Sequence, residues 1–243
     1  MSVIIKTHGV TKIYNKKIAV SNLSLSVRKG DIYGLIGSNG AGKTTLIRCI
    51  MGLVKLSAGE IEIFGENSHD ELVKARMKIG CIVESPSLLL NFNAFECLKT
   101  HALLYGIKDK QKIYDLLHLV GLTDTGNKKV KDFSLGMRQR MAVAQALIND
   151  PEILILDEPT NGMDPQGIIQ MREFLKMLVG KNNITILVSS HILAELQQYA
   201  TRFGIIKDGE LIAELTHEEI ISQPQTSLES YFISKVGAQS WGI

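Results

Sequence analysis

The first quarter of the chain alternates apolar and polar residues with the period of a β-strand. Leu23, Leu25 and Val27 alternate with two serines and an arginine, and residues 60–63 repeat the pattern with glutamate and isoleucine. Because strand side chains point alternately to the two faces of a sheet, this period is typical of half-buried, mostly antiparallel strands. Residues 2–65 are therefore predicted to be mostly strand.

One run in this region has a different pattern. Residues 32–36 read Ile-Tyr-Gly-Leu-Ile and are followed directly by another glycine. A short, continuously apolar run is typical of a parallel strand that is covered on both faces. A helix over Thr45–Ile50 is predicted to follow it.

Residues 67–150 have a helical pattern. One apolar stripe at helical spacing ends just before Gly121, where a helix can stop. A second helix is predicted over Met141–Ile148, closed by Asp150-Pro151. The members of the first stripe are Ile113, Leu116, Leu117 and Val120.

Strand and helix alternate in the remainder of the chain. Continuous apolar runs at Ile153–Leu156 and Ile184–Val188 predict buried parallel strands, and strand–helix–strand order implies a right-handed crossover between them. The helix between them is expected to bury a face that includes Phe174 and Leu178. Its other periodic positions are Ile169, Arg172, Leu175 and Val179.

These patterns predict one α/β domain with a mainly parallel sheet. We expect residues 1–84 and 151–215 to form the catalytic core with an antiparallel β subdomain. Residues 85–150 are expected to form an inserted helical subdomain, and 216–243 a C-terminal tail.

Composition narrows the classes of protein. The 243 residues are 45% hydrophobic and 21% charged, close to the globular norm, and the net charge of +2 argues against nucleic acid as a partner. A short basic run at residues 128–131 is interpreted as a solvated loop. The sparse cysteines, without C-x-x-C spacing, indicate buried thiols in a reducing compartment. They are Cys49, Cys81 and Cys97.

The chain also lacks sequence signals for export or membrane insertion. Its start, MSVIIKTHGV, has no long apolar region of the signal-peptide kind, and no stretch approaches the ~18 apolar residues of a spanning helix. We therefore expect a cytoplasmic protein whose membrane role, if any, comes through a partner.

A phosphate-binding motif, G-x-x-x-x-G-K-[ST], lies between the apolar strand 32–36 and the helix predicted after it. Its glycines let successive backbone N–H groups point at phosphate oxygens, and the helix N-terminus favours an anion. Lys43 can reach the β- and γ-phosphates, and the Thr44 hydroxyl can bind Mg²⁺. The motif comprises Gly37, Ser38, Asn39, Gly40, Ala41, Gly42, Lys43 and Thr44, and the predicted cofactor-binding segment extends to Thr45.

An acidic pair follows the apolar strand 153–156. Asp157 and Glu158 lie at the carboxyl end of this strand, the edge at which ligands bind in open α/β sheets. We expect Asp157 to bind Mg²⁺ and Glu158 to deprotonate the attacking water as the catalytic base. The strand is predicted to be the neighbour of the strand that precedes the phosphate motif.

A third motif identifies a family. Residues 133–140 read FSLGMRQR, directly before the helix predicted from residue 141. The segment resembles the signature motif of ABC ATPases, usually written LSGGQ, with Ser134 and Gly136 kept and Leu135 and Met137 as departures. In that family the motif binds the γ-phosphate held by the opposite subunit, so that two chains enclose two ATP molecules. The resemblance implies a P-loop NTPase core and a dimer with a second copy.

Other motifs follow in the family's order across nearly the whole chain. Tyr14 resembles the aromatic residue that stacks on adenine, although a lone tyrosine is more often a packing residue. Residues 160–165, Thr-Asn-Gly-Met-Asp-Pro, resemble the D-loop, in which Asp164 would bridge the dimer. His191, after the strand 184–188, resembles the switch histidine that contacts the γ-phosphate and is expected to act in catalysis.

Glu84 stands where the family has the glutamine of its Q-loop. In relatives that glutamine meets Mg²⁺ or its water, and the loop after it contacts the permease. We therefore expect Glu84 to act at the catalytic site and to join Thr44 and Asp157 as a metal ligand. The expected cofactors are ATP and Mg²⁺.

One subgroup of the family shares this glutamate. Together with FSLGMRQR, EPTNGMDP and the tail Ser227–Phe232, it resembles the ATPase subunits of bacterial lantibiotic-immunity and bacitracin-resistance exporters. The resemblance implies one or two permease partners, the removal of membrane-active antimicrobial peptides, and a position on the inner face of the cell membrane.

Four alternatives remain, and the sequence disfavours three of them. A non-catalytic interaction subunit is disfavoured because the chain carries the residues expected for catalysis, Lys43, Asp157, Glu158 and His191. A soluble ABC ATPase of DNA repair would carry a long coiled coil between the P-loop and the signature motif, and no heptad run fills residues 45–132. A translation-type factor would carry two cassettes, whereas this chain has a single P-loop. A transporter subunit for another substrate stays open, because the permease contacts the substrate.

Overall fold

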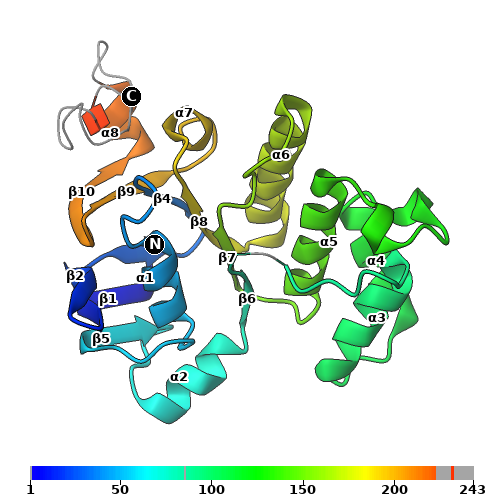
Figure 1. The fold of residues 1–243 in the computed structure, drawn as a ribbon, viewed down its shortest axis with the longest axis horizontal. Coiled ribbons are helices and arrows are strands. Elements are labelled where there is room, and N and C mark those ends of the chain that lie inside the picture. Colours follow the sequence, from blue (N-terminus) through cyan, green and yellow to red (C-terminus); the bar gives the residue numbers. More distant parts are fainter. Residues whose placement is uncertain (1, 85, 223–230, 233–243) are drawn as a thin grey trace.

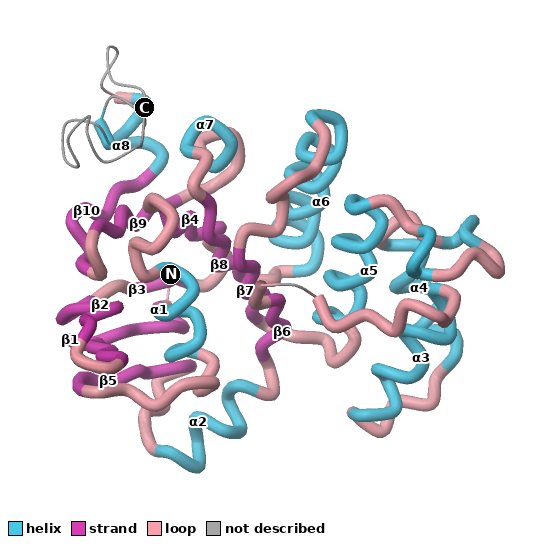
Figure 2. The backbone as a smooth tube through the Cα atoms, in the orientation of Figure 1, coloured by secondary structure: helices cyan, strands magenta, loops and turns pink. Residues whose placement is uncertain are grey.

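The computed structural model describes residues 2–84, 86–222, 231 and 232. Two sheets form its centre. Figure 1 shows the smaller sheet with strands β1, β2 and β5 on one side and the helices α3, α4 and α5 on the other, with the larger sheet running between them. Figure 2 shows the same layout, with β4, β8, β7 and β6 running through the middle of the molecule.

The smaller sheet is antiparallel, as the alternating pattern predicts. β1 is its central strand and pairs antiparallel with β2, β3 and β5. Leu23, Leu25 and Val27 are all buried, although they do not lie on one continuous strand: β2 ends at Leu23 and β3 begins at Ser26. Its strands are β1 (Val3–Tyr14), β2 (Lys17–Leu23), β3 (Ser26–Arg28) and β5 (Ala58–Ile63).

The larger sheet has six strands among the described residues, in the order β10-β9-β4-β8-β7-β6. All neighbours pair in parallel except β10 and β9, which confirms a mainly parallel sheet. The strands are β4 (Ile32–Ile36), β6 (Ile79–Ile82), β7 (Ile153–Asp157), β8 (Thr185–Ser190), β9 (Arg202–Lys207) and β10 (Glu210–Thr216).

The order of this sheet corrects one prediction. β7, which carries the acidic pair, is not the neighbour of β4, because β8 lies between them and pairs with both. After β7 the chain passes through one helix and returns as β8, which lies beside β7, as sequential strands usually do. β7 would show the same apolar pattern beside β4 as beside β8, so the pattern could not predict the order of the strands.

Several helices pack against the larger sheet, and three of them form the group that Figure 1 shows beside it. α3, α4 and α5 pack against one another, and apolar residues of this group join the core under the sheet. The four residues of the stripe before Gly121 are all buried there. The α-helices are α1 (Lys43–Ile50), α2 (His69–Arg76), α3 (Ala94–Leu104), α4 (Lys110–Leu119), α5 (Leu135–Leu147), α6 (Pro165–Asn182), α7 (Leu193–Leu196) and α8 (His217–Ile221), with 3-10 turns η1 (Thr123–Thr125) and η2 (Val130–Asp132).

Three local predictions need correction. The region 67–150 is not helical throughout, because β6 lies inside it and pairs with β7. α5 begins at Leu135 instead of Met141, because the Ser134 side chain caps it by accepting a hydrogen bond from the Met137 N–H at 3.2 Å. On α6, Leu178 is buried as predicted, but Phe174, expected on the same buried face, is only partly buried, and Ile169 is 49% exposed.

Two further predictions meet the structure only in part. Cys49 and Cys97 are buried and Cys81 is partly buried; all three are free thiols. Most of the tail that resembles the exporter subgroup lies outside the described residues, although Phe232 is buried. Within the described part of the chain, the helices are too short or too polar to cross a membrane.

Candidate active site

The phosphate motif forms the connection between β4 and α1. Gly42 is the N-cap of α1 with φ +109°, a backbone conformation that other residues rarely adopt, and a Cβ there would lie 2.5 Å from the Ala19 carbonyl oxygen. At Gly37 a Cβ would lie 2.6 Å from the Ile206 carbonyl oxygen. The two glycines therefore allow the loop to fold tightly against its neighbours, with the N-terminus of α1 directed into it.

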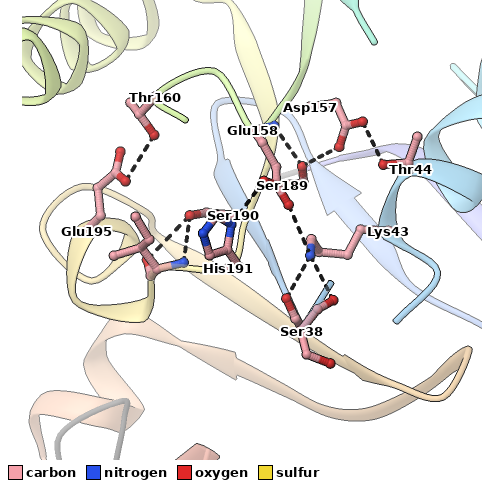
Figure 3. Close-up of polar contacts among 12 residues, drawn as sticks. Ser38, Lys43, Thr44, Asp157, Glu158, Thr160, Ser189, Ser190, His191 and Glu195 are labelled. Carbon is pink, nitrogen blue, oxygen red and sulfur yellow. Dashed lines mark hydrogen bonds and ion pairs between the residues drawn. The ribbon is translucent and has the colours of Figure 1, made fainter. Parts of the chain in front are cut away.

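Lys43 lies inside the curve of this loop. Its side chain is 4% exposed, and its ammonium donates hydrogen bonds to the carbonyl oxygens of Gly37 at 2.7 Å and Ser38 at 3.1 Å. The same ammonium is 3.3 Å from Oε1 of Glu158 (Figure 3). A buried cation needs such partners, and together they hold it at the mouth of the phosphate loop.

Thr44 and Asp157 meet although they come from different parts of the fold. The Thr44 hydroxyl, in the first turn of α1, donates to Asp157 Oδ2 at 2.7 Å. The Ser189 hydroxyl, on β8, donates to the other carboxylate oxygen at 2.6 Å. Thr44 and Asp157 present hard oxygen ligands of the kind that Mg²⁺ prefers, so this pair fits a Mg²⁺–phosphate site.

Ser189 is a site residue that the sequence interpretation missed. It pairs in register with Asp157 across β7 and β8, and its hydroxyl also accepts a hydrogen bond from the Glu158 N–H at 2.9 Å. Two parallel strands that end in polar residues bring those residues to one edge of a sheet. This signal was present in the sequence, but it depends on knowing that β7 and β8 are neighbours.

Glu158, which follows β7, contacts His191, which follows β8, and this is the second contact between the ends of these two strands. His191 Nδ1 lies 2.9 Å from Glu158 Oε2, and Lys43 lies next to the other carboxylate oxygen. Glu158 has φ +48°, which turns the chain sharply after β7 and directs the carboxylate toward the loop. Figure 3 shows Lys43, Glu158 and His191 in one continuous group of polar contacts.

The signature residues gather at a different place. Ser134 and Gly136 line an open cavity of about 470 Å³ together with Gly162 and Asp164. Asp164 caps α6 by accepting a hydrogen bond from the Gly167 N–H at 3.2 Å. In the part of the chain that the structure describes, no hydrogen bond or ion pair joins Ser134 or Asp164 to the phosphate loop. Their expected role, at the γ-phosphate held by a second chain, stays a prediction.

Tyr14 and Glu84 occupy two exposed positions around the site. Tyr14 ends β1, is 39% exposed, and has the Lys12 ammonium 4.7 Å from its ring centroid. Glu84 follows β6 with φ +60°, and its carboxylate pairs with Arg48 of α1. Among the described residues, Glu84 therefore forms an ion pair with Arg48, whereas the other two predicted metal ligands, Thr44 and Asp157, are hydrogen-bonded to each other. Metal binding by Glu84 stays a prediction.

Comparison with known proteins gives a consistent result. The family model described as ABC transporter matches residues 20–161. The bacitracin transport ATP-binding protein BcrA of Bacillus licheniformis is 46% identical over 229 residues, which cover 94% of this chain and 75% of BcrA. The lantibiotic transport ATP-binding protein SrtF of Streptococcus pyogenes is 40% identical over 215 residues, covering 88% of this chain and 91% of SrtF.

Solved structures agree. A dimeric, post-hydrolysis state of the ATP-binding cassette MJ0796, bound to ADP and Pi, matches with a TM-score of 0.77. It is 26% identical in sequence, and the match covers 88% of this chain and 99% of that chain. The match therefore extends over most of each chain.

Proposed function

Because the chain belongs to the ABC transporter family of ATP-binding proteins, we propose that it powers the removal of membrane-active antimicrobial peptides through separate permease subunits. The observation that carries this substrate class is the 46% identity to a bacitracin transport protein, together with 40% identity to a lantibiotic transport protein. The peptide class, the partners and the site roles below are parts of the proposal.

The chemistry is ATP hydrolysis, and each site residue has a distinct part in it. The amides of Gly37–Thr45 and the Lys43 ammonium would bind the phosphates. Thr44 and Asp157 would hold Mg²⁺, which neutralises phosphate charge when it is bound. Glu158 would take the proton of the attacking water, and His191, which touches Glu158, would hold that carboxylate toward the γ-phosphate.

A second copy of the chain would complete each site. Ser134 and Asp164 each bond within their own helix N-terminus and face a cavity away from Lys43. A helix N-terminus favours an anion, so the start of α5 could receive the γ-phosphate bound by the other chain. The dimeric arrangement of MJ0796 supports such a pairing.

An open cavity offers a place for the permease. It measures about 740 Å³ and lies between β6 and the helices α3 and α5, with Val83, Pro86, Leu104 and Tyr105 among its lining residues. Leu104 is 78% exposed, which is unusual for a leucine in a helix that also faces a core. We propose that residues 85–150 form a helical subdomain that docks a permease segment here, on the inner face of the membrane.

Two measurements test the function. In cells that lack the chain but keep the permease, the wild-type chain should restore tolerance to bacitracin or to a lantibiotic, and Glu158→Gln should not. Tolerance to an unrelated cytoplasmic antibiotic is the control. A pull-down from detergent-solubilised membranes should recover a polytopic permease. Recovery of ribosomes or DNA instead, or unchanged peptide tolerance, would overturn the proposal.

A further inference from the structure

Glu195 is a buried carboxylate beside the site with no part in the chemistry described above. It lies on α7, is 7% exposed, and accepts a hydrogen bond from the Thr160 hydroxyl at 3.0 Å. Thr160 is also buried, at 4% exposure. The second oxygen, Oε1, is buried without a hydrogen-bond partner among the described residues, and burial raises the pKa of Glu195. Keeping an incompletely paired carboxyl buried costs free energy, so a role is expected for it.

The hydrogen bond connects two segments that leave neighbouring strands. Thr160 comes two residues after Glu158, on the turn that leads from β7 to Asp164 at the start of α6. Glu195 comes four residues after His191, on the segment that follows β8. Figure 3 shows the Thr160–Glu195 pair on the far side of His191 from Lys43.

Three contacts tie these segments together in succession. The Glu158 N–H donates to Ser189 Oγ at 2.9 Å, His191 lies 2.9 Å from the Glu158 carboxylate, and Thr160 donates to Glu195. The first two contacts are partly buried at the ends of β7 and β8, whereas the third is buried. A hydrogen bond to a carboxylate in a buried environment is stronger than one in water.

We propose that Glu195 is a positioning residue that couples the His191 segment to the loop carrying Asp164. With Thr160 held by Glu195, a movement of His191 toward a bound phosphate also moves the turn 158–164, which would meet the second chain. Three groups lie close enough to interact electrostatically with Glu195: His191 before α7, Arg172 of α6 and Tyr199 after α7. Arg172 adds an attraction to the helix that Asp164 caps. The inference rests on the proposed ATP-bound dimer.

The test compares Thr160→Val with Thr160→Ser in the full-length chain. Valine keeps the shape and removes the hydroxyl, whereas serine keeps the donor. We expect Thr160→Val to lower kcat about tenfold, the effect of losing one buried hydrogen bond to a charged group, and to leave the Kd for a fluorescent ATP analogue within about twofold. Thr160→Ser should restore most of the turnover.

A second pair of variants probes the other partner. Glu195→Ala should behave as Thr160→Val does, whereas Glu195→Gln, which retains an acceptor oxygen, should stay within about threefold of wild type. The double variant Thr160→Val/Glu195→Ala should be no slower than either single one, because both remove the same contact. In a Glu158→Gln background, Thr160→Val should raise the ATP concentration needed for dimer formation on size exclusion.

Several results would overturn the inference. Unchanged kcat in Thr160→Val, equal effects of valine and serine, or additive effects in the double variant would each do so. A fall in kcat that follows a loss of ATP affinity or of thermal stability at the assay temperature would make Glu195 a packing residue only. A wild-type chain that hydrolyses ATP but confers no peptide tolerance would refute the proposed substrate and leave this test valid.

Discussion

The P-loop region and the signature region of this molecule are built in opposite ways. Around the P-loop, Lys43 and Asp157 are almost completely buried, and each has partners from more than one element of the fold. Around the signature motif, the side chains of Ser134 and Asp164 each accept one hydrogen bond from the first turn of their own helix. Leu135 beside them is 37% exposed.

The difference indicates which half of the chemistry one chain can organise by itself. A group held by several buried contacts keeps its geometry without help, and preorganised charge is effective in catalysis. The starts of α5 and α6, in contrast, line an open cavity, where N-terminal N–H groups favour an anion brought by a partner. Substitutions in the P-loop region should therefore affect the isolated chain, whereas those in the signature region should act through assembly.

Glu158→Gln should have the largest effect on the P-loop region. The amide keeps the size of the side chain and one oxygen for the Lys43 ammonium but cannot take a proton, so hydrolysis should fall at least ~100-fold. ATP binding should persist, and the closed dimer should accumulate as a larger species on size exclusion. Glu152→Gln is a matched control, since Glu152 also pairs with a lysine, Lys78, but at the surface. Normal turnover in Glu158→Gln would exclude Glu158 as the base.

Lys43→Ala should weaken binding as well as turnover. In the proposed site its buried ammonium would make a charge-assisted contact with the phosphates, and losing such a contact costs roughly 1.5–3 kcal/mol, or about 10–150-fold in affinity. Titration with ATP measures the effect. Lys78→Ala, at a lysine that is 59% exposed, should leave affinity unchanged. If Lys43→Ala kept both affinity and turnover, the assignment of the phosphate loop would be wrong.

Tyr14→Ala should have a smaller effect, confined to binding. A ring that stacks on a base contributes about 1–3 kcal/mol, and the chemical step does not use it. Tyr14→Phe keeps the ring and should bind ATP as the wild-type chain does, apart from any change in the contact with Lys12. Equal ATP affinity in Tyr14→Ala and wild type would return Tyr14 to a packing role.

Local patterns predicted the P-loop region well, because its chemistry follows single strands. The apolar runs before Gly37 and Asp157 are β4 and β7, and the motif residues lie at their carboxyl ends. What depends on strand order could not be predicted. The insertion of β8 between β4 and β7 places Ser189 beside Asp157, and periodicity does not encode that neighbour.

The signature region was predicted less completely because short polar contacts define it. The side chain of Ser134 caps α5, so this helix begins at Leu135, six residues before the predicted start at Met141. Thr160 and Glu195 are 35 residues apart, and neither the strand period nor the helix period around them predicts their buried contact.

The strand β6 was also missed, because four residues cannot display a clear period.

Glu84 belongs to neither region, and its substitution should affect transport more than hydrolysis. The side chain follows β6 at the edge of the proposed permease cavity and pairs with Arg48 of α1, the helix that begins in the phosphate loop. Glu84→Gln should leave ATP hydrolysis within ~10-fold of wild type, because Glu158 is untouched. A carboxylate would attract Mg²⁺ but repel the γ-phosphate, and these effects partly cancel.

The same substitution should lower peptide tolerance more than it lowers ATPase activity, because Glu84 links α1 to the segment beside the cavity. Arg48→Gln is the matched variant: it breaks the same exposed ion pair, which is worth at most about 1 kcal/mol, while keeping the carboxylate. The ATPase rate of the purified chain and the peptide tolerance of cells with the complete transporter decide the matter. If Glu84→Gln reduces both to the Glu158→Gln level, Glu84 is catalytic; if Arg48→Gln reproduces only the loss of tolerance, the ion pair carries the coupling.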